Sequence, residues 1–269
     1  MGNPRSRSRV ILAAALALLL AGWTGTAHAL VLNWDGVSWT PGSLNNSYDL
    51  NGDSINDITV TMTSKNNNFT NDPTTGTMTP AINQTLTGDQ SPVKNTLMIA
   101  GNLFTHSDIT VQLSFTGAQP GANNVSFSIF DIDVTTNSDI IDTIYGVALD
   151  GSLVAATITN VGSGVTLTGT GLNQVLTGNV ASPDSGPGSS NGNATISFGS
   201  TIITDVFFTF SNTAGAPRYQ DIAIGDLSFT PVPEINPAVA ASLSCVFAAG
   251  LTVFLKRRAA RRTILRAMT

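Results

Sequence analysis

Apolar and polar residues alternate along much of the chain. In residues 58–63, Ile58, Val60 and Met62 alternate with threonine, and in residues 109–115 every second side chain is apolar. A period of two predicts strands with one buried face and one solvent-exposed face. The same reasoning predicts strands at residues 97–100, 125–130, 164–168, 174–177, 194–198, 206–210 and 222–229.

Two further strands, residues 145–149 and 153–159, flank the pair Asp150-Gly151. Both residues tolerate positive φ, so the sequence predicts a tight hairpin there. Roughly ten short strands without a long helical pattern before the C-terminal tail predict an all-β fold. The expected architecture is an antiparallel β-sandwich, jelly-roll-like. No fixed repeat supports a solenoid, and residues 64–91 and 181–192 are expected to be long surface loops.

Both ends of the chain have the pattern of targeting segments. Arginines precede a short apolar run, and Ala27-His28-Ala29 is typical of a signal peptidase site, so residues 1–29 are expected to be a signal peptide. The exported domain is then residues 30–230, and the Pro-rich linker is residues 231–237. Residues 238–255 carry no charge over 18 positions, close to the length that a membrane-spanning helix needs. Six cations and no acid follow in residues 256–269, which predicts a cytoplasmic C-terminus.

A short Pro233-Glu234 motif precedes the apolar run, and Arg257 and Arg258 belong to the Arg-rich end that follows it. This arrangement resembles the PEP-CTERM sorting signal of bacterial envelope proteins, although Pro237 follows the motif only after Ile235-Asn236. The resemblance implies recognition and cleavage by an exosortase, and association with exopolysaccharide or biofilm at the cell surface. Glu234 is the only glutamate of the protein, as expected for a specific contact. A plain single-span anchor, as in a membrane-anchored adhesin, is the alternative.

Charge restricts the partners of the exported domain. It holds three basic residues, Lys65, Lys94 and Arg218, against 16 aspartates, a formal charge of −13. Such a field disfavours nucleic acid and anionic lipid and favours divalent cations. Cys245, the only cysteine, lies in the apolar run, so no disulfide forms within the chain.

Two acidic groups are candidate cation sites. Asp49, Asn51, Asp53 and Asp57 place side-chain oxygens at alternate positions around Gly52, a pattern that suits Ca²⁺. Val60 stands where an EF-hand needs its bidentate glutamate, which leaves a shorter calcium loop or a plain Asx-rich turn. The second group comprises Asp131, Asp133, Asp139 and Asp142, for which a solvated loop is the favoured alternative.

Catalysis has little support. His106 is the only histidine beyond the signal peptide, and although Asp108 is near it, no nucleophile elbow marks a serine. Trp34 and Trp39 bracket the first acidic loop together with Tyr48, so they are candidates for stacking on a sugar, with core packing as the alternative. The sequence therefore predicts a non-enzymatic exported surface protein, and the alternative is a calcium-stabilised carbohydrate-binding module; a wall-active hydrolase is a third possibility.

Overall fold

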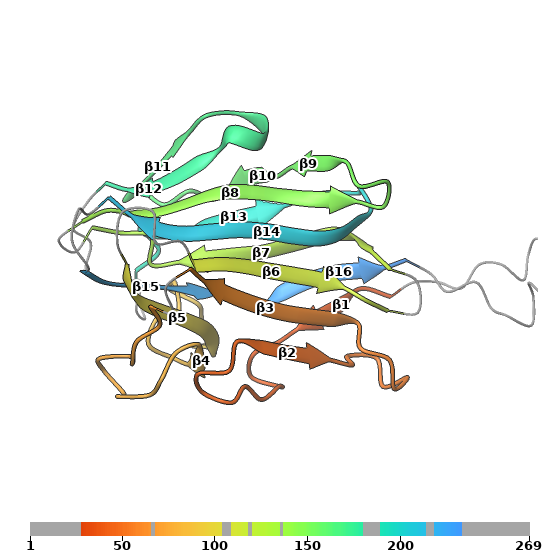
Figure 1. Ribbon diagram of the computed structural model, residues 1–269, viewed down its shortest axis with the longest axis horizontal. Coiled ribbons are helices and arrows are strands. Elements are labelled where there is room, and N and C mark those ends of the chain that lie inside the picture. Colours follow the sequence, from red (N-terminus) through yellow and green to blue (C-terminus); the bar gives the residue numbers. More distant parts are fainter. Residues whose placement is uncertain are drawn as a thin grey trace, which may run out of the picture. The chain divides into compact units, whose positions relative to one another are not determined.

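The computed structural model describes residues 28–65, 68–103, 109–117, 120–134, 137–179, 189–213 and 218–232 (Figure 1). Within these residues the chain forms 16 strands and one short 3-10 helix, η1 (Gly171–Asn173), and the strands pair antiparallel. The strands are β1 (Leu30–Leu32), β2 (Asn45–Tyr48), β3 (Ile58–Ser64), β4 (Ala81–Asn83), β5 (Thr96–Leu103), β6 (Ile109–Phe115), β7 (Ala122–Phe130), β8 (Asp139–Ala148), β9 (Leu153–Ala155), β10 (Thr157–Thr159), β11 (Val165–Thr168), β12 (Val175–Gly178), β13 (Ala194–Ser197), β14 (Ile203–Asn212), β15 (Arg218–Ile224) and β16 (Leu227–Pro231). The predicted all-β, antiparallel fold is confirmed.

The strands form two layers of one curled sheet. In the first layer β2, β3, β6, β14 and β8 lie side by side, followed by β12 and β11 (Figure 1). In the second layer β10, β13 and β7 are followed by β15 and β16, which pair with β5 and β1 respectively. One backbone pairing, Ile203 with Ala122, connects β14 to β7 and makes the hydrogen-bonded sheet continuous.

The core lies between the two layers. Phe127 of β7 stacks on Phe208 of β14 with ring centroids 5.9 Å apart. Phe115 of β6 meets Phe229 of β16 at 5.0 Å. The alternation in the sequence produces this core directly, because the buried positions of β6 are every second residue from Ile109 to Phe115.

The predicted hairpin is present between β8 and β9. Gly151 has φ +83°, and Asp150 accepts hydrogen bonds from the hydroxyl and the N–H of Ser152 at 2.6 and 2.9 Å. These contacts lower the pKa of Asp150. The predicted strand 153–159 is divided, however, because β9 pairs with β8 whereas β10 pairs with β13 of the other layer.

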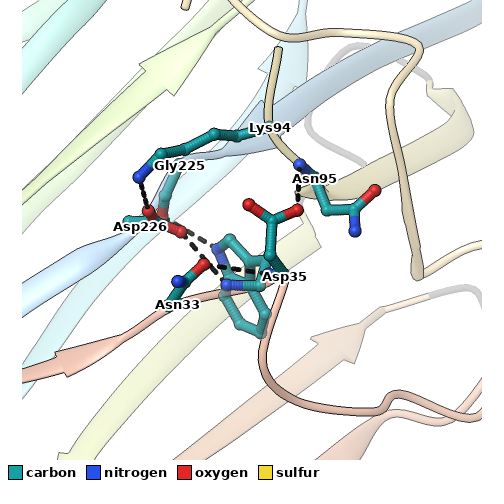
Figure 2. A network of polar contacts seen from close by, with 7 residues as sticks. Asn33, Asp35, Lys94, Asn95, Gly225 and Asp226 are labelled. Carbon is teal, nitrogen blue, oxygen red and sulfur yellow. Dashed lines mark hydrogen bonds and ion pairs between the residues drawn. The ribbon is translucent and has the colours of Figure 1, made fainter. Parts of the chain in front are cut away.

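The predicted strand 222–229 is also divided, by Gly225-Asp226, into β15 and β16. This interruption anchors the N-terminal segment (Figure 2). Trp34 donates its ring Nε1–H to the Gly225 carbonyl at 2.9 Å and its backbone N–H to Asp226 at 3.1 Å. Lys94 forms an ion pair of 2.7 Å with the other oxygen of Asp226, which raises the pKa of Lys94.

The sequence suggested that residues 64–91 form a long surface loop, but the structure shows more than a loop there. They contain β4, and Leu86 packs with Met98, Phe130 and Ala223 in a second, smaller apolar cluster. Gly88 is required by this packing, because a Cβ there would lie 2.3 Å from the Phe130 ring and its φ is +59°. The polar composition hid a short strand and a few anchoring apolar residues.

Most of the other predicted loop, residues 181–192, lies outside the described residues. The same is true of nearly all of the signal peptide and of residues 233–269 with the apolar run 238–255. No helix in the described part of the chain is long and apolar enough to cross a membrane.

Candidate functional site

The first acidic loop is closed by its own backbone. Asp49 accepts hydrogen bonds from the N–H groups of Gly52 and Ser54, at 2.7 and 2.8 Å. Asp57 accepts from Leu50 N–H at 2.7 Å, and Asn51 donates to Asp53 at 2.9 Å. The loop thus folds back on itself through side chains that bind nearby N–H groups, as in Asx turns.

This geometry corresponds to the turn alternative. Asp57 is buried, and burial raises its pKa. Among the residues that the structure describes, no three His, Cys, Asp or Glu side chains are arranged to hold a metal ion. The arrangement of Asp49, Asn51, Asp53 and Asp57 therefore gives no support to the predicted calcium site.

The second acidic group is more buried than the sequence suggested. Asp131, Asp133 and Asp139 are each at most 3% exposed, in place of a solvated loop. Asp139 accepts a hydrogen bond from Gln220 Nε2 at 2.6 Å and one from the backbone N–H of Asp133 at 3.2 Å. Burial, with the charges of Asp133 and Asp131, raises the pKa of Asp139 well above its usual value.

Membership of this group also differs from the prediction. Asp221, on β15, is close enough to raise the pKa of Asp139 further, and sequence reasoning missed it because the two are far apart in the chain. Asp142 instead accepts hydrogen bonds from Thr209 and from Thr143, the latter at 2.9 Å. The buried carboxylate of Asp139 is therefore held by a polar network inside the fold, whereas Asp142 has threonine partners.

The two tryptophans belong to the core. Trp34 and Trp39 are 1% and 6% exposed, and Trp34 meets the rings of Trp39 and Tyr48 edge-on at 6.4 and 6.3 Å. Burial raises the pKa of Tyr48 to about 12. Neither tryptophan offers a ring face to a ligand, so the suggested stacking role is corrected and the packing alternative is what the structure has.

An aromatic pair that the sequence did not single out lies on the outer face of the first layer. Tyr145 of β8 and Phe207 of β14 are direct cross-strand partners, partly exposed, with ring centroids 5.3 Å apart and ring planes at 28°. Both side chains point away from the core, because their neighbours Ile144 and Phe208 are buried in it. The outward-facing residues of the neighbouring strands β6 and β3 are polar, so the pair is followed along the sheet by hydrogen-bonding side chains.

The pair belongs to a line of side chains that crosses five adjacent strands, here called the aromatic row: Tyr145, Phe207, Gln112, Thr61 and Asn45. All five are at least partly exposed. Asn45 donates to the Thr61 hydroxyl at 2.8 Å. The row thus has an aromatic end on β8 and β14 and an amide–hydroxyl end on β2 and β3.

A parallel line runs beside it, here called the Asp205 row: Val147, Asp205, Ser114, Thr59 and Ser47. One carboxylate oxygen of Asp205 accepts from the Ser114 hydroxyl at 2.6 Å and from Gln112 Nε2 at 2.9 Å. These contacts fix the carboxylate and the amide next to the aromatic pair. The second oxygen of Asp205 receives no hydrogen bond in the described part of the chain.

The arrangement can recognise sugars. Aromatic rings stack on the apolar C–H faces of pyranoses, while carboxylate, amide and hydroxyl groups exchange hydrogen bonds with sugar hydroxyls. The sequence does contain one signal for it, since Phe207 falls in the polar phase of its strand together with Asp205 and Thr209. The run Val206-Phe207-Phe208 conceals that phase, and the register between strands cannot be read from a single sequence.

Other predicted site residues lie outside the described residues. They are His106, Asp108, Pro233, Glu234, Pro237, Arg257 and Arg258. The last described residue, Val232, donates its N–H to the Gly121 carbonyl at 3.1 Å.

Comparisons with known proteins give no family. No protein-family model matches the sequence, and no curated protein is significantly similar to it. Among solved structures, a family 11 carbohydrate-binding module from Clostridium thermocellum, in complex with a β-1,3-1,4-mixed-linked tetrasaccharide, is 13% identical over 78% of this chain and 99% of that chain, with a TM-score of 0.31. A cleaved adhesin domain of Lys-gingipain from Porphyromonas gingivalis is 11% identical over 77% and 99%, with a TM-score of 0.30. Likenesses this remote assign no ligand.

Proposed function

We propose that the exported domain is a non-catalytic polysaccharide-binding module. The observation that carries this proposal is the exposed Tyr145–Phe207 pair beside the fixed carboxylate of Asp205 and the amide of Gln112. An open sheet face of this kind suits a polymer, which needs a long surface rather than a closed pocket. The binding residues are therefore assigned to the sheet, and Trp34 and Trp39 to its core.

Binding to immobilised polysaccharides tests the proposal. Phe207→Ala and Tyr145→Ala each remove half of the aromatic surface, and we expect at least about a tenfold loss of affinity, about 1.4 kcal/mol. Their free energies of unfolding should change little, because an exposed cross-strand pair contributes only about 0.2–1 kcal/mol. Leu167→Ala on β11, also an exposed apolar residue, is the control and should bind as the wild type does.

One result would contradict the assigned site, and another would contradict the function. Unchanged binding in both aromatic variants would place the ligand elsewhere on the molecule. Release of reducing sugar from any bound polysaccharide would favour the hydrolase alternative over a binding module.

We also propose that the module is exported, anchored and then released by an exosortase. In support, β16 ends at Pro231 and the motif begins at Pro233, so a recognition sequence would follow the folded domain directly. Intact-mass measurement of the envelope form is the test. We expect the wild type to end near the motif and Glu234→Ala to keep its C-terminal residues; identical masses that both include residues 238–269 would favour the plain anchor.

A further inference from the structure

The side chains of the two rows on the outer face carry a single charge. Asp205 is the one charged residue among the ten members of the aromatic row and the Asp205 row. Lys65 follows the end of β3 directly and is four residues, or about 13 Å of extended chain, beyond Thr61. Within these ten residues a negatively charged ligand would meet a carboxylate and no cation.

The rows also have a direction. Each runs perpendicular to the strands, from β8 to β2. With strands about 4.8 Å apart, the four intervals between Tyr145 and Asn45 measure about 19 Å. The polar members along this line are uncharged groups that both donate and accept, Gln112, Thr61 and Asn45. A ligand that contacts both ends must span about 19 Å, and hydroxyl groups along an extended chain would suit these side chains because they too both donate and accept.

We infer that the ligand is an uncharged glycan chain that lies across the strands along the aromatic row, with one sugar on Tyr145 and Phe207 and later sugars over Gln112, Thr61 and Asn45. This inference rests on the proposed polysaccharide-binding function. Asp205 accepts a hydrogen bond from a sugar hydroxyl through its second oxygen, because its first oxygen already accepts hydrogen bonds from Ser114 and Gln112. Uronic acid polymers are disfavoured because their carboxylates would lie beside Asp205 without a compensating cation.

A panel of soluble polymers tests the charge of the ligand. The full chain in detergent is run in native gels that contain hydroxyethylcellulose, mixed-linkage β-glucan or dextran as uncharged probes, polygalacturonate as an anionic probe, or chitosan as a cationic probe. Retardation by at least one uncharged polymer and none by polygalacturonate is the expected result. Binding to a charged polymer alone would overturn the inference but leave polysaccharide binding intact, whereas no binding to any polymer would overturn both.

The path of the glycan along the aromatic row is tested with oligosaccharides cut from the polymer that binds. Thr61→Val removes the hydroxyl at the far end of the row while keeping a β-branched side chain. We expect this substitution to lower the affinity for a hexasaccharide by roughly two- to tenfold, because one hydrogen bond is lost, and to leave the affinity for a disaccharide unchanged. Phe207→Ala should weaken both.

Thr63→Val is the matched control, because Thr63 lies on the same strand and the same face but is paired with Thr110 outside both rows. It should bind the hexasaccharide as the wild type does. Equal losses in Thr61→Val and Thr63→Val, or no loss in Thr61→Val, would show that the chain does not follow the aromatic row.

Discussion

The domain contains two aromatic groups that differ in what surrounds them. Trp34, Trp39 and Tyr48 pack edge to face in the core, whereas Tyr145 and Phe207 stack on the outer face of a sheet. The buried group includes both tryptophans of the described residues, the residue type most readily associated with sugar stacking. Trp34 and Trp39 lie between β1 and β2, where the chain buries them, whereas Tyr145 and Phe207 lie on the outward-facing phase of β8 and β14. The position of a ring in the fold, rather than its size, therefore determines whether the ring is exposed.

Polar contacts follow the same division. Trp34 uses its ring N–H to fix the Gly225 carbonyl at 2.9 Å, so its polar atom contributes to folding. Beside Phe207, Gln112 and Ser114 instead orient the carboxylate of Asp205 at a surface. Hydrogen bonds stabilise the fold in the first group, and in the second they orient polar groups at an exposed face.

The largest expected effect is at Trp34. Trp34→Ala should lower the free energy of unfolding by about 3–5 kcal/mol, because it empties a large volume in the core. Binding by the remaining folded protein should be unchanged. Urea denaturation gives the first quantity and polysaccharide affinity the second; a specific loss of affinity without loss of stability would reverse the assignment of the two groups.

The two tryptophans should also differ from each other. Trp39 Nε1 is buried without a hydrogen-bond partner among the described residues, whereas Trp34 Nε1 has Gly225. Trp34→Phe leaves the buried Gly225 carbonyl without this donor and should cost about 1–3 kcal/mol. Trp39→Phe removes an unsatisfied donor and should cost less; equal losses in urea denaturation would contradict this difference.

Two carboxylates show the same contrast between surface and interior. Asp205, on the surface, and Asp139, in the interior, each accept a hydrogen bond from a glutamine side chain. The pKa of Asp139 is raised by burial and by Asp133 and Asp131. The folded state therefore binds this proton more tightly than the unfolded state, where the pKa is about 3.9. The stabilisation from protonated Asp139 is fully present below that value and is lost as the pH rises through the folded pKa.

The Tm of the Asp139→Asn variant, relative to that of the wild type, should accordingly increase as the pH rises from about 4 to about 7. The measurement is the difference in Tm between the two proteins at each pH. Asp205→Asn controls for removal of one negative charge from the domain. A difference in Tm for Asp139→Asn that does not change with pH would contradict the assignment of the raised pKa to Asp139.

The sequence predicts the fold better than the site, and the reason is physical. Alternation within one strand is local, so the strands that begin at Ile58 and Ile109 begin where they were predicted. The aromatic row depends on the register among five strands, which is set by contacts far apart in the chain. The grouping of Asp139 with Asp221 has the same cause. Short strands such as β4 were not predicted, because three residues are too few to show an alternating pattern.

The smallest expected effect is at Lys94, in the network that holds the buried aromatic group in place. Lys94 is 38% exposed, and an ion pair of this kind contributes about 0–1 kcal/mol, so Lys94→Met should lower the free energy of unfolding by no more than that. Asp226 also accepts the backbone N–H of Trp34 at 3.1 Å. Asp226→Ala should therefore cost more, about 1–3 kcal/mol, because it removes the ion pair and leaves a partly buried donor without its partner. Urea denaturation of the two variants compares them directly. If Lys94→Met were the more damaging, the ion pair and not the contact to Trp34 would secure the N-terminal segment.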